Sequence, residues 1–390
     1  METNHAVTAV AVSGGADSLF TLIRLQEEGV PVIAVHGIFA QNLDLGPHSG
    51  AAQEEALGVQ ERLMDSCATL GVPLHIIDLS IPFMNQVIRP FVEQYAAGMT
   101  PNPCAVCNRH IKFGLLLDSV RALGAERIAT GHYVRLAVPG MPLNAVTSCP
   151  EMLHPPALLQ GADPNKDQSY FLSLIPVERL SSALFPLGGA QKTEVLQTLA
   201  RRGIPVPQPG ESRGICFIPD DEYREFVPLA AERLGLLLSG PGPMLLADGT
   251  RLGTHKGLWQ YTEGQRHGLG VGWKEPLHVL AKEKDGNTLR LAPRQDLWTE
   301  SCECGQVNLL LPPEFWPETV LVKTRYRETP RPVQVHVTRS PDETSMRIRF
   351  LTKETAVAPG QVAAIYIPLS GCFESDGRPI LRLAAGGIIR

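Results

Sequence analysis

Three of the eight cysteines stand where a thiol could react. Cys104 and Cys107 are separated by two residues, at the point where a proline-rich loop enters a predicted helix. Cys107 falls near the predicted helix N-terminus and beside Arg109 and Lys112, and both features favour the thiolate, which is the reactive form. Cys216 lies two residues after Gly214 in a short apolar run, which suits a thiol on a segment that moves. These positions predict chemistry at sulfur.

A glycine-rich turn after the first predicted strand could bind phosphate. Residues 13–18 read Ser-Gly-Gly-Ala-Asp-Ser. Glycines let backbone N–H groups close on a phosphate, the following helix N-terminus adds a favourable dipole, and Ser13 and Ser18 add hydroxyl donors. No lysine follows the second glycine, so the turn is not a Walker A loop. The alternative is a tight strand-to-helix turn with Asp17 near the start of the helix.

The elements that would position these residues alternate along the first part of the chain. Short apolar runs predict strands and longer stretches with helical spacing predict helices. The predicted strands are 7–12, 31–35, 72–79 and 127–130, and the predicted helices are 17–23, 51–71 and 108–122. Strands that alternate with helices at this pitch predict an α/β fold with a doubly wound parallel sheet.

The rest of the chain divides into further segments. Residues 136–164 are expected to form a hairpin or surface insertion, and residues 168–203 have helical spacing. The proline-rich stretch 205–210 marks the first domain boundary, and short alternating strands after Pro276 predict a small β-barrel or sandwich. The predicted domains are 1–208 for catalysis, 209–276 as a central linker domain, and 277–390 as the β-barrel.

Charge is distributed unevenly. The net charge is -5, with 35 basic and 40 acidic residues, which taken alone argues against a nucleic-acid partner. The first hundred residues, however, contain no lysine and three arginines against eleven acids, a net of -8, and the remainder is +3. A polyanion is therefore expected to meet the later segments. The alternative is that charge merely fluctuates between domains.

Composition excludes several classes of protein. Eight cysteines in 390 residues are too few for a disulfide scaffold. No signal peptide is recognisable at the start, and no uncharged apolar stretch reaches the roughly 18 residues that a membrane span needs. We therefore expect a cytoplasmic multidomain protein with reduced thiols and no membrane partner. Cys67 and Cys372 are expected to be small buried residues.

The sequence blocks together resemble a known family. Residues 13–18 resemble the SGGxDS loop of the PP-loop ATP pyrophosphatases, and the whole chain resembles the bacterial tRNA-specific 2-thiouridylase family (MnmA type). The blocks that carry this resemblance are 37–40 (GIFA), 99–114 (MTPNPCAVCNRHIKFG), 130–133 (TGHY), 165–171 (NKDQSYF), 185–188 (FPLG), 211–218 (ESRGICFI), 261–270 (YTEGQRHGLG), 323–327 (KTRYR) and 358–361 (APGQ). The implied fold is an N-terminal PP-loop domain of adenine nucleotide alpha hydrolase type, a small central mixed domain and a C-terminal antiparallel β-barrel.

The resemblance also implies a reaction. ATP, with Mg²⁺, adenylates the 2-oxygen of the wobble uridine, and a Cys216 persulfide supplied by a sulfur-relay or cysteine desulfurase donor provides the sulfur. Cys107 releases that sulfur, and a Cys107–Cys216 disulfide results. The implied ATP-binding residues are Ala11, Val12, Ser13, Gly14, Gly15, Ala16, Asp17, Ser18, Ala40 and Gly131. The implied tRNA-binding residues are Asn102, Pro103, Cys104, His132, Lys166, Asp167, Gln168, Arg325, Tyr326 and Gln361.

The sequence departs from the family pattern at position 104. Many members carry Asp after Asn-Pro, where it is thought to assist acid–base steps, whereas this chain has Cys104. With Cys107 and Cys216 it makes a set of three cysteines that could hold a 4Fe-4S cluster with one open iron, able to carry sulfide. The alternative is that Cys104 simply fills the space of the Asp. Zinc at Cys302 and Cys304 is disfavoured, because only one residue separates them.

Two other functions remain open at this stage. One is a PP-loop synthetase that adenylates a small molecule, which would not need Cys107 with Cys216 or a C-terminal barrel. The other is a tRNA-binding protein without catalysis, which an intact phosphate loop and intact cysteines disfavour. The favoured interpretation is an ATP-dependent tRNA sulfurtransferase.

Overall fold

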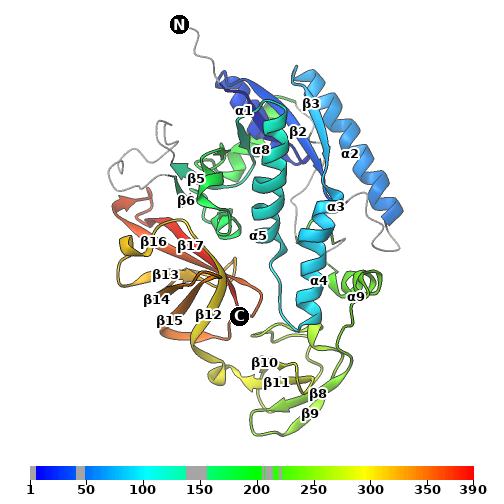
Figure 1. Ribbon diagram of the computed structural model, residues 1–390, viewed down its shortest axis with the longest axis vertical. Helices are drawn as coiled ribbons and strands as arrows, with labels where there is room; N and C mark the ends of the chain where they lie inside the picture. The colour runs from blue at the N-terminus through cyan, green and yellow to red at the C-terminus, as the bar shows by residue number, and fades with distance from the viewer. Residues whose placement is uncertain (1–5, 41–48, 138–155, 204–205, 207–213, 219–221) are drawn as a thin grey trace.

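The strands of the described residues form three sheets. The computed structural model describes residues 6–40, 49–137, 156–203, 206, 214–218 and 222–390. The proline-rich boundary at 205–210 therefore lies almost wholly outside the described residues, as do Cys149 and residues 211–213. Figure 1 shows the N-terminal α/β domain, the β-rich C-terminal domain and a smaller central sheet. No helix in the described ranges is long and apolar enough to span a membrane.

The N-terminal sheet confirms the predicted doubly wound fold. Its five parallel strands have the order β3-β2-β1-β4-β7. Their bounds are β1 Thr8–Ala11, β2 Val32–Ile38, β3 Leu74–Asp78, β4 Arg127–Ala129 and β7 Ala183–Leu184. The short strand β7 interrupts the tract 168–203, which was expected to be helical throughout. A two-residue strand leaves no periodicity in the sequence, so the pattern could not reveal it.

Helices pack around this sheet and extend beyond it. Residues 80–96 and 103–122 each form a continuous helix with a π-helical segment in it, and these helices run down toward the central sheet (Figure 1). The helices are α1 Ala16–Glu27, α2 Ser49–Thr69, α3 Ser80–Phe83, η1 Met84–Ile88, α4 Arg89–Ala96, α5 Pro103–Cys107, η2 Asn108–Leu116, α6 Leu117–Ala122, η3 Ser169–Leu172, α7 Val177–Leu180 and α8 Lys192–Arg201.

The central domain is larger than the sequence indicated. After α9 (Tyr223–Leu234), four strands form a sheet in the order β10-β11-β8-β9. They are β8 Gly242–Leu246, β9 Arg251–His255, β10 Leu277–Glu283 and β11 Thr288–Pro293, with a 3-10 turn η5 at Leu258–Gln260. The predicted boundary at 276/277 is therefore wrong. Strands β10 and β11 read like barrel strands, but β11 pairs with β8 and completes the central sheet.

The C-terminal domain is the expected antiparallel β-barrel. The ring runs β12-β15-β14-β13-β16-β17 and closes because β17 also pairs with β12. The strands are β12 Trp298–Leu309, β13 Val320–Lys323, β14 Arg331–Arg339, β15 Thr344–Thr355, β16 Val362–Phe373 and β17 Pro379–Ile389, with 3-10 turns η6 at Arg294–Asp296 and η7 at Pro313–Phe315. Closure leaves no free edge among these strands. Cys302 and Cys304 pack in its core.

One hairpin joins the N-terminal domain to the barrel. Strands β5 (Val134–Ala137) and β6 (Ala157–Gln160) pair with each other, and β6 pairs with β17 at Leu159 and Arg382. The described ends of segment 136–164 thus form the expected hairpin. Cys67 and Cys372 are both buried, as expected.

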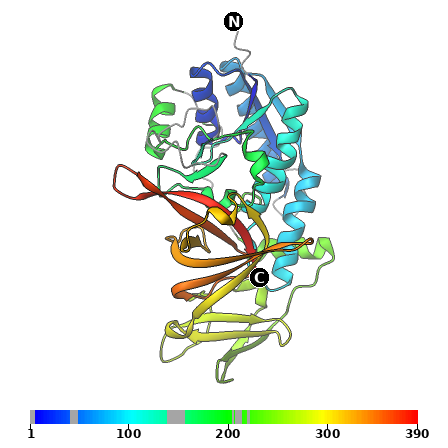
Figure 2. The ribbon, with the colours of Figure 1, turned by 60° about the vertical axis from the view of Figure 1, so that its left-hand side comes forward.

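One apolar cluster extends through all three parts, while the barrel and the central sheet also have cores of their own. It contains α4 and η2 side chains, Phe217 just after Cys216, and Tyr366 and Leu383 from the barrel. In Figure 2 the orange-to-red barrel lies between the blue-to-cyan N-terminal domain and the yellow central strands. Because the core is continuous, the barrel is packed against the helices that carry the cysteines.

Candidate functional site

The predicted glycine-rich turn forms between β1 and the N-terminus of α1. Gly14 has a φ of 93°, a conformation that favours glycine. The Ser18 hydroxyl donates to the carbonyl of Gly15 at 2.9 Å and accepts from the backbone N–H of Ser13 at 3.1 Å. Ser13 is exposed, while Ala16 and Ser18 are buried. These hydrogen bonds hold the loop at the N-terminus of α1, where the positive end of the helix dipole favours a phosphate.

The loop lies at the reversal point of the sheet. Strand β1 has β2 on one side and β4 on the other, so the strand order reverses between β1 and β4. Gly131 follows β4 and approaches α1 closely, because a Cβ there would lie 2.9 Å from the backbone carbon of Asp17. Ala40 follows β2 and is half-buried. The carboxyl edge at such a reversal is where α/β sheets bind ligands, and these residues fit a nucleotide there.

Asp17 has two partners that the sequence analysis missed. The ammonium group of Lys192, at the start of α8, lies 2.7 Å and 2.8 Å from the two carboxylate oxygens. The Tyr133 hydroxyl donates to Asp17 Oδ1 at 2.7 Å. Tyr133 stands in a quoted sequence block, but Lys192 stands in none, and 175 positions separate it from Asp17. Only the packing of α8 against α1 shows that Lys192 belongs to this site.

The cysteine loop enters its helix through an asparagine cap. The side-chain oxygen of Asn102 accepts a hydrogen bond from the N–H of Ala105 at 3.2 Å, and Pro103 occupies the first helical turn. Asn102 and Pro103 are buried, Cys104 is half-buried and Cys107 is buried. The α-helix changes to a π-helix directly after Cys107. Such segments are frequent at functional sites.

Cys216 is exposed beside a strong apolar anchor. The next residue, Phe217, packs edge-on against Phe83 and Phe91 and lies 5.5 Å from the ring of Phe226. Gly214, with a φ of 84°, allows the turn that precedes the cysteine. Cys216 is therefore exposed as a residue, and its neighbour fixes it to the core around α4, while the protein around the sulfur desolvates the thiol.

The structure brings the cysteines within electrostatic range of one another. Burial, together with the charges of Cys216 and Cys104, raises the pKa of the Cys107 thiol to about 12, while Lys112 opposes the shift. Desolvation by the surrounding protein also raises the pKa of Cys216, again against Lys112. The expectation of a Cys107 thiolate is thus wrong, because desolvation outweighs the cation. Lys112 lowers the pKa of Cys107 as predicted, and it also lowers that of Cys216, which was not predicted.

The predicted cluster ligands are near each other but do not form a ligand set. Among the described residues, no group of three or more His, Cys, Asp or Glu is placed to hold a metal ion. Cys104, Cys107 and Cys216 are therefore not placed around a single metal ion, and the 4Fe-4S cluster stays a prediction.

The residues expected to contact tRNA divide into buried and accessible groups. Asp167 is 5% exposed, and it accepts hydrogen bonds from the N–H groups of Gly161 and Ser169 at 3.1 Å. Gln168 accepts from the N–H of Tyr133 at 3.0 Å. Burial raises the pKa of Asp167 despite these bonds. Asp167 and Gln168 therefore hold the loop in shape. Lys166 is half-buried and supplies a cation on this loop.

The remaining predicted tRNA residues also make contacts within the protein. The ring of Tyr326 lies 4.4 Å from that of Phe171. Arg325 donates to the carbonyl oxygens of Glu263 and Ala356 at 2.7 Å and 3.0 Å. His132 is buried and lies 2.7 Å from the Thr130 hydroxyl through Nδ1, and burial holds its pKa well below the usual value.

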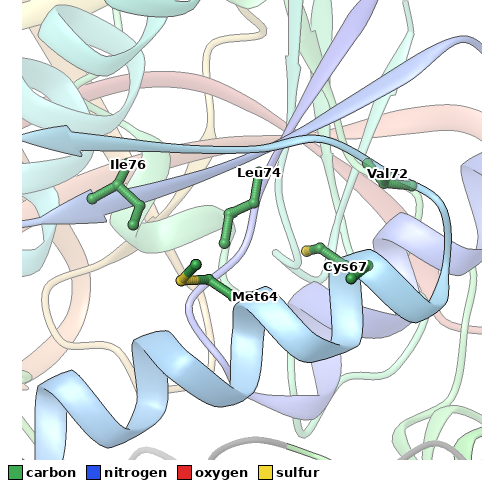
Figure 3. Close-up of a pocket in the computed structure, with 6 residues that line it drawn as sticks. Met64, Cys67, Val72, Leu74 and Ile76 are labelled. Atoms are coloured by element: carbon green, nitrogen blue, oxygen red, sulfur yellow. The ribbon is translucent and has the colours of Figure 1, made fainter.

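A shallow apolar pocket lies apart from these residues. It opens between α2 and the edge strand β3, and Figure 3 shows Met64 and Cys67 facing Leu74 and Ile76. None of the residues that line it is a candidate site residue. The pocket therefore lies outside the candidate site.

Comparisons with known proteins agree with this architecture. Residues 6–220 match the tRNA methyl transferase HUP domain, residues 235–293 the tRNA methyl transferase PRC-barrel domain, and residues 300–371 the aminomethyltransferase beta-barrel domain. The second match ends with β11, as the strand pairing does.

Curated relatives match along almost the whole chain. The tRNA-specific 2-thiouridylase MnmA of Oleidesulfovibrio alaskensis (strain G20) is 47% identical over 384 residues, covering 98% of each chain. That of Nitratidesulfovibrio vulgaris (strain Miyazaki F) is 44% identical over 384 residues, also covering 98% of each. That of Lawsonia intracellularis is 44% identical over 361 residues, covering 92% of this chain and 95% of the relative. This chain therefore belongs to the tRNA-specific 2-thiouridylase (MnmA) family.

Proposed function

We propose that this chain catalyses the ATP-dependent transfer of sulfur to C2 of the wobble uridine in tRNA. The observation that carries the proposal is the proximity of Cys107 and Cys216, which lie far apart in the sequence: the charge of Cys216 acts on Cys107, and Lys112 acts on both thiols. A PP-loop enzyme that adenylates a small molecule has no need for two neighbouring thiols. The names of the relatives, which specify tRNA and 2-thiouridine, support the same function.

The nucleotide half of the reaction uses the loop at the N-terminus of α1. ATP supplies an adenylyl group that turns the uridine 2-oxygen into part of a leaving group. The loop N–H groups and the exposed Ser13 hydroxyl bind and orient the phosphates, while the Ser18 hydroxyl, which donates to the Gly15 carbonyl, holds the loop in shape. The uridine oxygen displaces pyrophosphate. Lys192 and Tyr133 hold the Asp17 carboxylate beside this loop. Mg²⁺ remains a prediction tied to ATP.

The sulfur half uses the two thiols. A donor protein leaves a persulfide on Cys216, which is exposed and can be reached. The terminal sulfur attacks C2, and AMP leaves with the former 2-oxygen. Cys107 then attacks the inner sulfur of Cys216, so that the S–S bond breaks, a Cys107–Cys216 disulfide forms and the transferred sulfur stays on the base. A thiol reductant restores both cysteines. Lys112 stabilises the thiolates that form and leave.

The cluster-based alternative has a separate test. It would use sulfide bound to a 4Fe-4S cluster on Cys104, Cys107 and Cys216 in place of the persulfide. The described cysteines do not surround a single metal ion, and the iron content of the protein distinguishes the two mechanisms. Anaerobically purified protein that contains about four irons and acid-labile sulfide per chain, and that loses them in Cys104→Ser, would favour the alternative.

The proposed tRNA surface combines Lys166 with residues of the barrel. Lys166 and Tyr326 are half-buried and lie outside the acidic first hundred residues. Phosphates require cations, and unstacked bases stack on aromatic rings and guanidinium groups. Asp167, Gln168, Asn102 and Gln361 act mainly by holding the loops that present this surface.

The direct test is a reaction with purified components. The protein is incubated with ATP, a sulfide source and unmodified tRNA, and 2-thiouridine is measured by nucleoside mass spectrometry. We expect product that depends on ATP, and its loss in Cys216→Ser and Cys107→Ser. Full activity of Cys216→Ser would contradict the sulfur mechanism, and a Cys67→Ser variant controls for the loss of a buried thiol elsewhere.

A further inference from the structure

The central domain and the barrel both form hydrogen bonds to Thr100, in the loop that precedes Cys104 and Cys107. Thr100 lies two residues before the Asn102 cap of the helix that carries Cys104 and Cys107. Its N–H donates to the carbonyl of Pro359 at 2.7 Å, and Gln361 Nε2 donates to the Thr100 carbonyl at 3.0 Å. Both backbone groups of Thr100 are thus bound by the barrel domain.

The Thr100 hydroxyl is bound by the central domain. Lys282 Nζ donates to it at 3.1 Å, and the hydroxyl in turn donates to Thr262 Oγ1 at 3.3 Å. A threonine hydroxyl can accept and donate at once, so one side chain joins two groups of the neighbouring domain.

The lysine that reaches Thr100 is itself fixed. Its side chain is 1% exposed and lies 3.4 Å from the carboxylate of Glu263, whose side chain is 7% exposed. Lys282 also donates to the carbonyl of Tyr261 at 2.9 Å. A buried ammonium with three oxygen partners has little freedom to move. Losing one of these partners costs more than it would at the surface, because water cannot take its place.

The two domains that bind Thr100 are also joined to each other by a hydrogen bond. Arg325 of the barrel donates to the carbonyl of Glu263 in the central domain at 2.7 Å. On the opposite side Gly360 has a φ of 93°, and a Cβ there would lie 2.9 Å from the Thr100 carbonyl oxygen. This close approach requires glycine at position 360. Sequence blocks 99–114, 261–270, 323–327 and 358–361 therefore converge on one loop.

We propose that Thr100 is a positioning residue, through which the central and barrel domains set the loop that carries Cys104 and Cys107. The positioning of the loop is independent of the proposed function, but its purpose, the placing of Cys107 for sulfur transfer, rests on that function. Thr100 touches neither the nucleotide loop nor the thiols. It fixes the backbone just before the helix cap, and so determines where Cys107 lies relative to Cys216.

The test compares Thr100→Val, which keeps the shape but removes the hydroxyl, with Thr100→Ser, which keeps the hydroxyl. Thr288→Val is the matched control, because Thr288 is a buried threonine of the central sheet whose hydroxyl bonds within its own turn. N-ethylmaleimide labelling of Cys107 is measured by peptide mass spectrometry relative to Cys67, a buried thiol of another core cluster that reports global unfolding.

We expect Thr100→Val to label Cys107 about fivefold to tenfold faster relative to Cys67, as the loss of one or two buried hydrogen bonds predicts. Thr100→Ser and Thr288→Val should match the unchanged protein. In the thiolation assay Thr100→Val should lower kcat with little change in the KM for ATP. Equal labelling of Cys107 in all four proteins would overturn the proposal. Faster labelling in Thr100→Val, with no thiolation by the unchanged protein, would keep the positioning role and reject the proposed function.

Discussion

Lys192 and Asp17 form an ion pair at 2.7 Å that joins the start of α8 to the start of α1. The pair is half-buried and shares Asp17 with the Tyr133 hydroxyl. It places a cation next to the loop of Ser13 to Ser18, where a nucleotide would bring negative charge. The paired carboxylate lies at the helix N-terminus, which also favours an anion.

Replacing this lysine should weaken nucleotide binding. Lys192→Met removes the cation and leaves Asp17 facing the phosphates without its partner, so the affinity for ATP should fall about tenfold or more. Titration calorimetry with a non-hydrolysable ATP analogue measures the change. Arg201→Met, at the exposed end of the same helix, should bind the analogue normally. An unchanged affinity in Lys192→Met would remove Lys192 from the site.

The contact between Gly131 and α1 should not tolerate a methyl group. In Gly131→Ala the new Cβ would meet Asp17 and the backbone nitrogen of Ser18 at 3.0 Å or less, so the loop must shift. We expect a loss of stability of about 1–3 kcal/mol and at least tenfold weaker ATP binding. Gly272→Ala, with no atom within 4 Å of the added Cβ, is the control. Thermal unfolding and calorimetry together check both effects.

The reactivity of Cys216 should increase steadily with pH. Because its pKa is raised, the thiol is protonated near neutral pH, and the thiolate fraction grows about tenfold per pH unit until the pKa is approached. Iodoacetamide labelling of Cys216 should therefore still be rising at pH 9. A plateau below pH 8 would show a lowered pKa instead.

Lys112 should account for part of that reactivity. Lys112→Met removes the cation that lowers the pKa of Cys216, so labelling at pH 8 should become slower by several fold. Arg109→Met is the matched control, because Arg109 acts on the pKa of His110. A similar slowing in both variants would mean that general loss of charge, not Lys112, is responsible.

Lys166 should contribute a phosphate contact. Lys166→Ala is expected to weaken tRNA binding severalfold at low salt and to reduce the slope of log affinity against log salt concentration by about one. Filter binding over a series of salt concentrations measures the slope. Arg347→Ala, whose charge pairs with Glu303 on the barrel surface, should leave it unchanged. An unchanged slope in Lys166→Ala would exclude a phosphate contact at this residue.

The sequence by itself determined the local features of the site. The Ser-Gly-Gly turn between a buried strand and a helix, the Asn102 cap before Pro103 and the first four parallel strands all follow from contacts within a few residues. Glycine conformations, capping and periodicity act over such short distances, so the residue order reveals them.

Only the tertiary structure decided which distant segments of the chain contact one another. It paired β11 with β8, closed the barrel through β12 and β17, brought Lys192 to Asp17, and set both later domains on Thr100. It also raised the pKa of Cys107 where the neighbouring cations alone predicted a thiolate. The physical reason is that strand pairing, burial and desolvation depend on which elements pack together, and helical or strand periodicity carries no record of that choice.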